Sequence, residues 1–171
     1  MDPFATLGLP RTFDIDLRAV EATHRELSRT LHPDRYVGAS ATERRQALAH
    51  AVEVNEAWRI VRDPVRRAQA LLELGGEPFG EDGGPKADPA FLMEMLEDRE
   101  ALADAKSARN LDAVRRLAEA IEARMQRVEA ELSTRFARGG ERVALAGKVG
   151  QLRFYRRFLD EVSAIEDELA A

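Results

Sequence analysis

The sequence contains no cysteine and no long run of apolar residues. Without cysteine the chain can form no disulfide, offers no thiol nucleophile and holds no cysteine-based zinc or iron–sulfur site. Its apolar stretches fall far short of the roughly 20 residues that a membrane-spanning helix requires. The first ten residues lack a basic stretch followed by an apolar core. We therefore predict no secretory signal, no membrane partner and a cytoplasmic protein.

An excess of basic charge is also absent. The net charge is −5, and because residues 1–75 hold equal numbers of acidic and basic side chains, the whole deficit falls on residues 76–171. Nucleic-acid phosphates require a basic surface, so we predict no binding to nucleic acid. Aromatic residues make up 6% of the chain and charged residues 33%, a composition typical of a helical protein in water.

Glycine and proline are concentrated in residues 75–85, which hold five glycines and two prolines. A segment so rich in helix breakers separates two helical parts. We predict a first part over 1–75, a linker over 76–88 and a second part over 89–171. Phe79 is expected to pin the linker to one of these parts.

Residues 1–75 have the pattern of a helical hairpin. Asp16 is a favoured N-cap for a first long helix that ends near Leu31. A second long helix covers about 41–61, and Pro64 interrupts it before a short final helix. Long helices with so short a connection pack antiparallel.

Each long helix is expected to have two faces. On the first, Arg18, Arg25 and Arg29 lie about 200° around the wheel from the apolar Val20 and form a basic stripe. Such a stripe is by itself typical of a solvated face. Leu71 and Trp58 should help to close the core. Side chains three and four apart mark the expected packed face of the second helix: Leu48, Ala51, Val52, Asn55 and Trp58.

The tripeptide His32-Pro33-Asp34 lies between these two helices. Pro33 lacks an amide hydrogen and disfavours a helical conformation at His32, so the first helix should close there. His32 and Asp34 are then on an exposed loop, where folding requires no particular polar residue. Alone, the tripeptide is equally compatible with an ordinary helix connection.

Residues 89–171 predict an antiparallel bundle of three helices. Asp88-Pro89 is typical of a helix start, and the helices cover about 89–107, 110–136 and 141–169. The middle helix carries apolar residues alternately three and four apart, which is the seam of a bundle. They are Leu111, Val114, Ala118, Ile121, Met125, Val128, Leu132 and Phe136.

The first helix of this bundle has more apolar surface than one packed face requires. Phe91, Met95 and Leu102 form its expected core stripe. A second set lies about 100° to 200° around the wheel, among carboxylates. It consists of Leu92, Met93 and Leu96, and the neighbouring carboxylates are those of Glu97, Glu100 and Asp104. An apolar patch bordered by charge is typical of a protein-docking surface. Packing of Leu92 and Leu96 against another helix is equally compatible with the periodicity.

The last helix shows a similar excess. Leu152, Tyr155 and Leu159 are expected to face the core, whereas Phe154 lies about 160° from Leu152. Phe158 and Ile165 are assigned with Phe154 to a second stripe that points away from the core. If Phe154 is exposed beside Leu92 and Leu96, the surplus residues form one patch for a protein partner.

These features together are similar to a known family. Residues 1–75 resemble a J-domain in the basic helix, in His32-Pro33-Asp34 and in three further motifs. The motifs are Phe4-x-x-Leu7-Gly8-Leu9-Pro10, Asn55-x-Ala57-Trp58-x-x-Val61 and Pro64-x-x-Arg67-Ala68-x-x-Leu71-Leu72. The second part resembles the HscB family of co-chaperones in Phe91-Leu92-Met93-Glu94-x-Leu96-Glu97-x-Arg99-Glu100 and in Leu152-Arg153-Phe154. The resemblance implies an all-α fold, with an N-terminal J-domain helical hairpin and a C-terminal antiparallel three-helix bundle.

The resemblance also implies a function in bacterial iron–sulfur cluster assembly. The bundle would bind the cluster scaffold IscU, and the J-domain would deliver it to HscA, a DnaK-type chaperone, and stimulate its ATP hydrolysis. The implied chaperone-binding residues are His32, Pro33, Asp34, Arg35, Arg25 and Arg29. The implied scaffold-binding residues are Leu92, Met93, Leu96, Glu97, Glu100 and Phe154. No catalytic residue, metal or cofactor is implied for the chain itself.

Three positions depart from the family pattern. Arg35 stands where lysine is common, which keeps the charge. His24 replaces a larger apolar residue on the inner face of the basic helix, so we expect it to be half-buried and to soften the packing there. The N-terminal cysteine pair of some eukaryotic relatives is absent, which predicts that this protein binds no cluster itself.

Other functions are compatible with parts of the pattern. A J-domain co-chaperone of a general DnaK-type chaperone could recruit a different client, and a bundle could be purely structural. An enzyme could use His32 as a base oriented by Asp34, but no nucleophile or metal site accompanies them. We therefore predict no enzymatic activity of the chain's own.

Overall fold

The computed structural model describes residues 1–76 and 87–170, and every regular element among them is a helix. The chain divides into two compact units, Met1–Pro78 and Phe79–Ala171. Phe79 and most of the predicted linker lie outside the described residues. In the part that is described, no helix is long and apolar enough to cross a membrane. The all-α prediction is confirmed.

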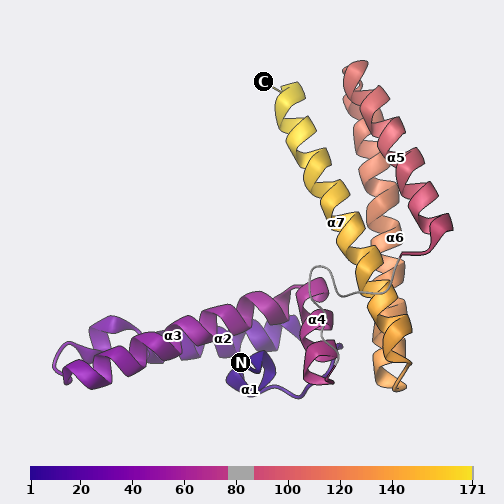
Figure 1. Cartoon of the computed structure of the whole chain (residues 1–171). Helices are drawn as coiled ribbons and strands as arrows, with labels where there is room; N and C mark the ends of the chain where they lie inside the picture. The colour runs from indigo at the N-terminus through magenta and orange to yellow at the C-terminus, as the bar shows by residue number, and fades with distance from the viewer. Residues whose placement is uncertain (77–86, 171) are drawn as a thin grey trace. The chain divides into compact units, whose positions relative to one another are not determined.

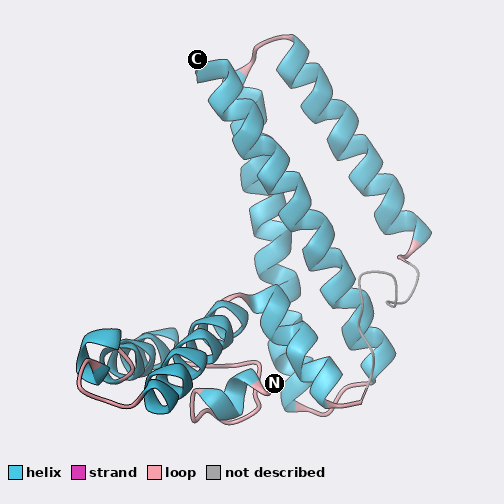
Figure 2. Cartoon of the chain, turned by 60° about the vertical axis from the view of Figure 1, so that its left-hand side comes forward, coloured by secondary structure: helices cyan, strands magenta, loops and turns pink. Residues whose placement is uncertain are grey.

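The first unit contains α1 (Pro3–Thr6), α2 (Leu17–Thr30), the 3₁₀ helix η1 (Pro33–Tyr36), α3 (Ala41–Arg62) and α4 (Pro64–Leu74). Helices α2 and α3 lie side by side as a hairpin, and α1 and α4 pack against α3 (Figures 1 and 2). Asp16 accepts hydrogen bonds from the first backbone amides of α2, as its N-cap position predicts. Asp63 does the same for α4, with Pro64 in the first turn.

The core of this unit lies between α1, α2, α3 and α4. Phe4, Val20, Val54, Ala57 and Val61 are buried in it, together with Leu7, Leu31 and Ala70. Trp58 and Leu71 pack against this cluster at its edge, which confirms their predicted place. Phe4 and Ala57 are 0% exposed, so α1 is an integral part of the core despite its single turn.

The predicted packed face of α3 is wrong for Leu48 and Val52. Their side chains are 60% and 61% exposed. The buried side chains of α3 are Ala47, Val54, Ala57 and Val61. The packed face of α3 is therefore rotated about the helix axis from the predicted one, and its two alanines allow neighbouring backbones to approach closely.

Arg67 joins α4 to the end of α3. It is 8% exposed, and its Nη1 donates a hydrogen bond of 2.7 Å to the carbonyl of Val61. Carbonyls in the last turn of a helix have no partner within that helix, so this bond caps α3. The guanidinium also lies 4.7 Å from the ring centre of Phe13. The loop before α2 is thereby held against α4.

The second unit is a bundle of α5 (Pro89–Ser107), α6 (Leu111–Ala137) and α7 (Arg142–Ala170). Ion pairs join Arg99 to Glu161 and Lys106 to Glu168, so α5 and α7 run parallel to each other. Helix α6 runs in the opposite direction and packs against both (Figure 2). The predicted seam of α6 is confirmed at its centre, because Val114, Ile121, Val128 and Leu132 are buried.

The turn between α6 and α7 depends on a glycine. Gly139 has φ +68° and donates to the carbonyl of Phe136, while Gly140 donates to that of Arg135 over 2.8 Å. These are the two bonds of a Schellman motif, in which the left-handed position favours glycine. The predicted helix end is therefore confirmed.

The predicted stripe of α7 is wrong for Phe158 and Ile165. They are only 0% and 5% exposed and lie in the core with Leu152, Tyr155 and Val162. Helix α7 packs against both α5 and α6, so its buried face is wider than a single stripe.

Candidate functional site

His32, Pro33 and Asp34 form an exposed, locally ordered corner between α2 and α3. His32 has an extended backbone, with φ −61° and ψ 134°, and is the N-cap of η1. Its Nδ1 accepts a hydrogen bond of 3.3 Å from the backbone N–H of Asp34. The same Nδ1 lies 3.5 Å from Asp34 Oδ2. The side chains of His32 and Asp34 are 59% and 86% exposed, so the corner presents both polar groups to a partner.

The basic stripe of α2 lies on the solvent side, as predicted. Arg25 and Arg29 are exposed and lie 3.9 Å and 3.5 Å from Glu21 and Glu26 on the same helix. Exposed pairs of this kind contribute little to stability, so the guanidiniums can exchange these partners for others. Arg35 is exposed beside the His32–Asp34 corner.

His24 joins α2 to α3. It is half-buried as predicted, but its ring stacks on Trp58, with centres 5.2 Å apart and planes 15° apart. Its Nε2 lies 3.0 Å from Asn55 Oδ1 and 3.3 Å from Ser28 Oγ. The expected softening of the packing is therefore offset by a polar contact that an apolar residue could not make.

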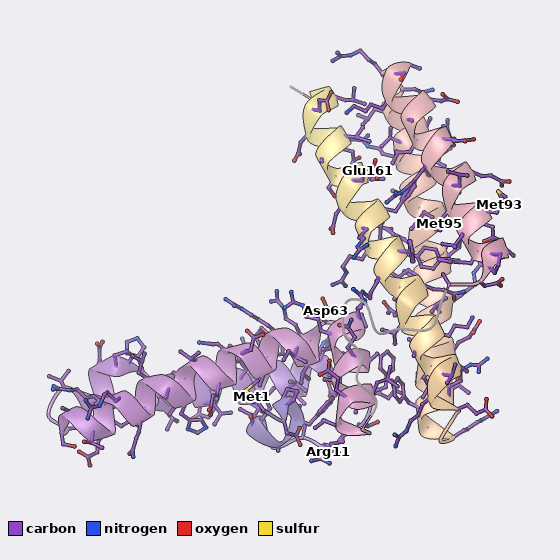
Figure 3. All side chains as sticks on the ribbon, in the orientation of Figure 1. Met1, Arg11, Asp63, Met93, Met95 and Glu161 are labelled. Carbon is purple, nitrogen blue, oxygen red and sulfur yellow. The ribbon has the colours of Figure 1, made fainter. Side chains whose placement is uncertain are left out.

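The outer face of α5 is apolar and exposed. Leu92, Met93 and Leu96 are 42%, 58% and 53% exposed. Figure 3 shows Met95 directed between the helices and Met93 on the opposite side of α5. Glu97 and Glu100 are exposed on the same helix. Packing of Leu92 and Leu96 against another helix of the bundle is thus excluded among the described residues.

Phe154 of α7 is half-buried and packs against α5 at Phe91, the residue before Leu92. Its ring lies edge-on to Phe91, with centres 5.6 Å apart and planes 75° apart. Phe91 meets Tyr155 in the same manner, at 5.5 Å and 78°. Phe91 directly precedes Leu92, so the aromatic cluster and the exposed leucines belong to one end of α5.

A charged pair lies beneath this face, and sequence reasoning missed it. Asp98 accepts hydrogen bonds from both terminal nitrogens of Arg124 on α6, at 2.5 Å and 3.3 Å. The bond to Asp98 raises the pKa of Arg124. Burial, together with the nearby carboxylates of Glu94 and Asp98, raises the pKa of Tyr155 despite the opposing effect of Arg124. The signal was available, because Asp98 interrupts the core stripe of α5 between Met95 and Leu102.

Comparison with known proteins places the chain in a family. The family model described as the HSCB C-terminal oligomerisation domain matches residues 87–163. The co-chaperone protein HscB homolog of Burkholderia cenocepacia is 40% identical over 162 residues, which cover 94% of this chain and 91% of that protein. The chain belongs to the HscB family of co-chaperones.

Other relatives agree with this HscB assignment. The HscB homolog of Ralstonia nicotianae is 37% identical over 97% of this chain and 94% of its own. The chaperone HscB from Vibrio cholerae superposes with a TM-score of 0.85 at 32% identity, over 99% of both chains. The human co-chaperone protein HscB shares the fold, with a TM-score of 0.88 at 23% identity over 97% of this chain and 82% of its own.

Within residues 1–76 and 87–170, no three histidine, aspartate or glutamate side chains come together where they could hold a metal ion. The structure brings the predicted chaperone-binding residues together around the α2–α3 corner. It gathers the predicted scaffold-binding residues on α5 and the adjoining turn of α7.

Proposed function

We propose that this HscB-family protein is a cytoplasmic co-chaperone of iron–sulfur cluster assembly. Residues 1–75 act as a J-domain, residues 76–88 as a linker and residues 89–171 as a client-binding bundle. The bundle binds an IscU-type scaffold, and the J-domain delivers it to an HscA-type chaperone and stimulates ATP hydrolysis there. The observation that carries this proposal is that each unit has its own exposed surface, one polar and one apolar.

The polar surface suits a transient partner. Arg25, Arg29 and Arg35 present guanidiniums beside the His32–Asp34 corner, and an acidic surface on the chaperone would be attracted to them. Such attraction raises the association rate and sets orientation more than it raises affinity. His32, Pro33 and Asp34 are then positioned to act on the chaperone's nucleotide cycle through their locally fixed geometry.

The apolar surface suits a client that must be retained. Leu92, Met93 and Leu96 provide an anchor that loses water on contact, with Phe154 at its edge. Glu97 and Glu100 supply a charged border that orients a basic client surface. Apolar anchors of this type mainly slow dissociation, which keeps the client bound during transfer.

Transfer follows from carrying both surfaces on one chain. A scaffold bound to α5 is present at a high effective concentration near any chaperone that the J-domain engages. The chain need supply no catalysis, because the ATPase belongs to the chaperone.

The alternative partner is a general DnaK-type chaperone with another client. The α2–α3 corner alone would serve such a protein equally well. The α5 face favours the dedicated scaffold, since the matching residues are the ones on which the family resemblance rests. Stimulation of both chaperones, measured side by side, distinguishes the two.

The scaffold site is tested by replacing its anchor. We expect Leu92→Ala with Phe154→Ala to weaken binding of an IscU-type scaffold at least tenfold in calorimetry, as loss of anchor residues does. Val143→Ala is the matched control, because Val143 is 70% exposed on α7 outside the proposed site. Stimulation of the chaperone without scaffold should be unchanged in both variants. Unchanged scaffold affinity in the double variant would remove the site.

A further inference from the structure

Leu48 and Val52 are apolar side chains that the fold does not use. They lie one turn apart on α3 and are 60% and 61% exposed. The hydrophobic cluster of the first unit contains neither of them, either in its buried centre or among the side chains packed against it. Two exposed branched side chains four residues apart form one continuous apolar spot.

This spot lies on the same side of the hairpin as the contact between α2 and α3 that His24 makes with Asn55. Leu48 and Val52 fall within about 60° of Asn55 on the helical wheel. Asn55 Oδ1 is 3.0 Å from His24 Nε2, which in turn lies 3.3 Å from Ser28 Oγ. On α2, the basic stripe begins about 60° beyond Ser28, at Arg25. The apolar spot on α3 and the basic stripe on α2 therefore lie on either side of the contact between His24 and Asn55.

The spot is also at the end of the hairpin that carries the tripeptide. Because α2 and α3 are antiparallel, moving from His24 towards the end of α2 corresponds to moving from Asn55 towards the start of α3. This places Val52 level with about Ser28 and Leu48 level with about His32. The contact between η1 and α3 agrees with that register.

The charges around the spot specify the partner's chemistry. Arg44 and Arg45 are exposed and flank Leu48 and Val52 on the wheel, whereas Glu56, one turn beyond Val52, is paired with Arg59 over 3.7 Å. The sector from Arg44 to Arg45, about 100° wide, contains no acidic residue. A matching surface would be apolar at its centre and acidic at its rim, which is the sign that the α2 stripe also requires.

We propose that Leu48 and Val52 are an apolar anchor through which α3 docks on the DnaK-type chaperone, alongside the α2 stripe and His32-Pro33-Asp34. This inference rests on the proposed function and extends the chaperone surface from α2 and the corner onto α3. The scaffold is a poorer occupant, because its site on α5 has an acidic border and selects the opposite charge. A second copy is disfavoured because it would bring Arg44 and Arg45 of one copy against the same arginines of the other.

The test replaces the anchor without disturbing the fold. Leu48→Gln with Val52→Gln keeps helix propensity, and both side chains are exposed, so stability should be unchanged. We expect the concentration of full-length protein that half-maximally stimulates the chaperone's ATPase to rise about tenfold, with full stimulation at saturation. The increase should be similar at low and high ionic strength, since apolar contacts are not screened. Arg25→Gln with Arg29→Gln should instead lose effect as salt rises.

Val143→Gln provides the control for an equally exposed apolar position. A half-maximal concentration within twofold of the parent protein in the Leu48/Val52 variant overturns the inference. The inference is also overturned if the Leu48/Val52 substitutions change only the affinity for the scaffold, only self-association in sedimentation, or only the hydrodynamic radius of the protein without partners. The last result would indicate closure onto the chain's own acidic half. Failure of the parent protein to stimulate at all is a different result, which refutes the proposed function itself.

Discussion

Asp98 of α5 and Arg124 of α6 form a two-pronged ion pair inside the three-helix bundle. Their side chains are 14% and 33% exposed, whereas Lys106 and Glu168 pair at 42% and 62% exposure. Sliding one helix along the other would leave the charge in the apolar stripe of α5 without its partner on α6. Such a pair therefore fixes the register of the two helices. The register matters here because α5 carries Leu92 and Leu96.

Removing Arg124 tests this relationship. We expect Arg124→Ala to lower the free energy of unfolding of the bundle by about 1–2 kcal/mol, because Asp98 is left largely buried without its partner and solvent screens only part of the loss. Lys106→Ala should cost less than about 0.5 kcal/mol. Urea unfolding of the full chain followed by far-UV circular dichroism measures both, with Trp58 fluorescence reporting separately on the first unit. Equal costs for the two variants would argue against a special role for Asp98–Arg124.

Replacing Phe158 should lower the free energy of unfolding by more than replacing Arg124 does. The side chain is fully buried, so Phe158→Ala should cost about 3–5 kcal/mol through lost contacts and the cavity that remains. The exposed Val143 should tolerate alanine within about 0.5 kcal/mol. If Phe158→Ala were as mild as Val143→Ala, the outward stripe predicted from the sequence would be right and the packing of α7 described above wrong.

Acid should loosen the start of α3. Ser40 and Glu43 form a reciprocal capping box, and hydrogen bonding from Ser40 lowers the pKa of Glu43 below its usual range. A carboxylate with a lowered pKa stabilises the folded state above its unfolded pKa, near 4, and loses that effect as pH falls through the folded value. Amide exchange in the first turn of α3 should therefore accelerate as pH falls below about 4, after correction for intrinsic rates. Glu43→Gln should remove most of this pH dependence. If the exchange rates of that variant followed pH as those of the parent protein do, the pH dependence would come from a group other than Glu43.

Helix limits could be predicted from the sequence because they depend on local chemistry. Asp16, Asp88 with Pro89, and Gly139 each act on backbone groups within a few residues. The exposure of His32 and Asp34 follows from Pro33 in the same way. The surplus of apolar residues on α5 was also visible in the sequence, but periodicity left open whether Leu92 and Leu96 pack against another helix.

The buried face of each helix was harder to predict, because it depends on which other helices pack against it. Leu48 and Val52 were assigned to the core by their i, i+3, i+4 spacing, but α3 packs through a different face, that of Ala47, Val54, Ala57 and Val61. Phe158 and Ile165 were assigned outward because a single stripe was assumed for a helix that packs on two sides. The Asp98–Arg124 pair joins separate helices, so periodicity within one helix shows only half of it.

In the proposed function, His32-Pro33-Asp34 triggers a partner chaperone on behalf of a bound scaffold. Asp34→Asn keeps the size of a side chain that is 86% exposed, so the fold and the α5 face should be unaffected. The decisive measurement is steady-state ATP hydrolysis by the HscA-type chaperone with IscU-type scaffold and either the parent protein or this variant. We predict strong stimulation by the parent protein, greater with scaffold than without, and loss of stimulation by Asp34→Asn while scaffold affinity is unchanged. Normal stimulation by Asp34→Asn would contradict the claim.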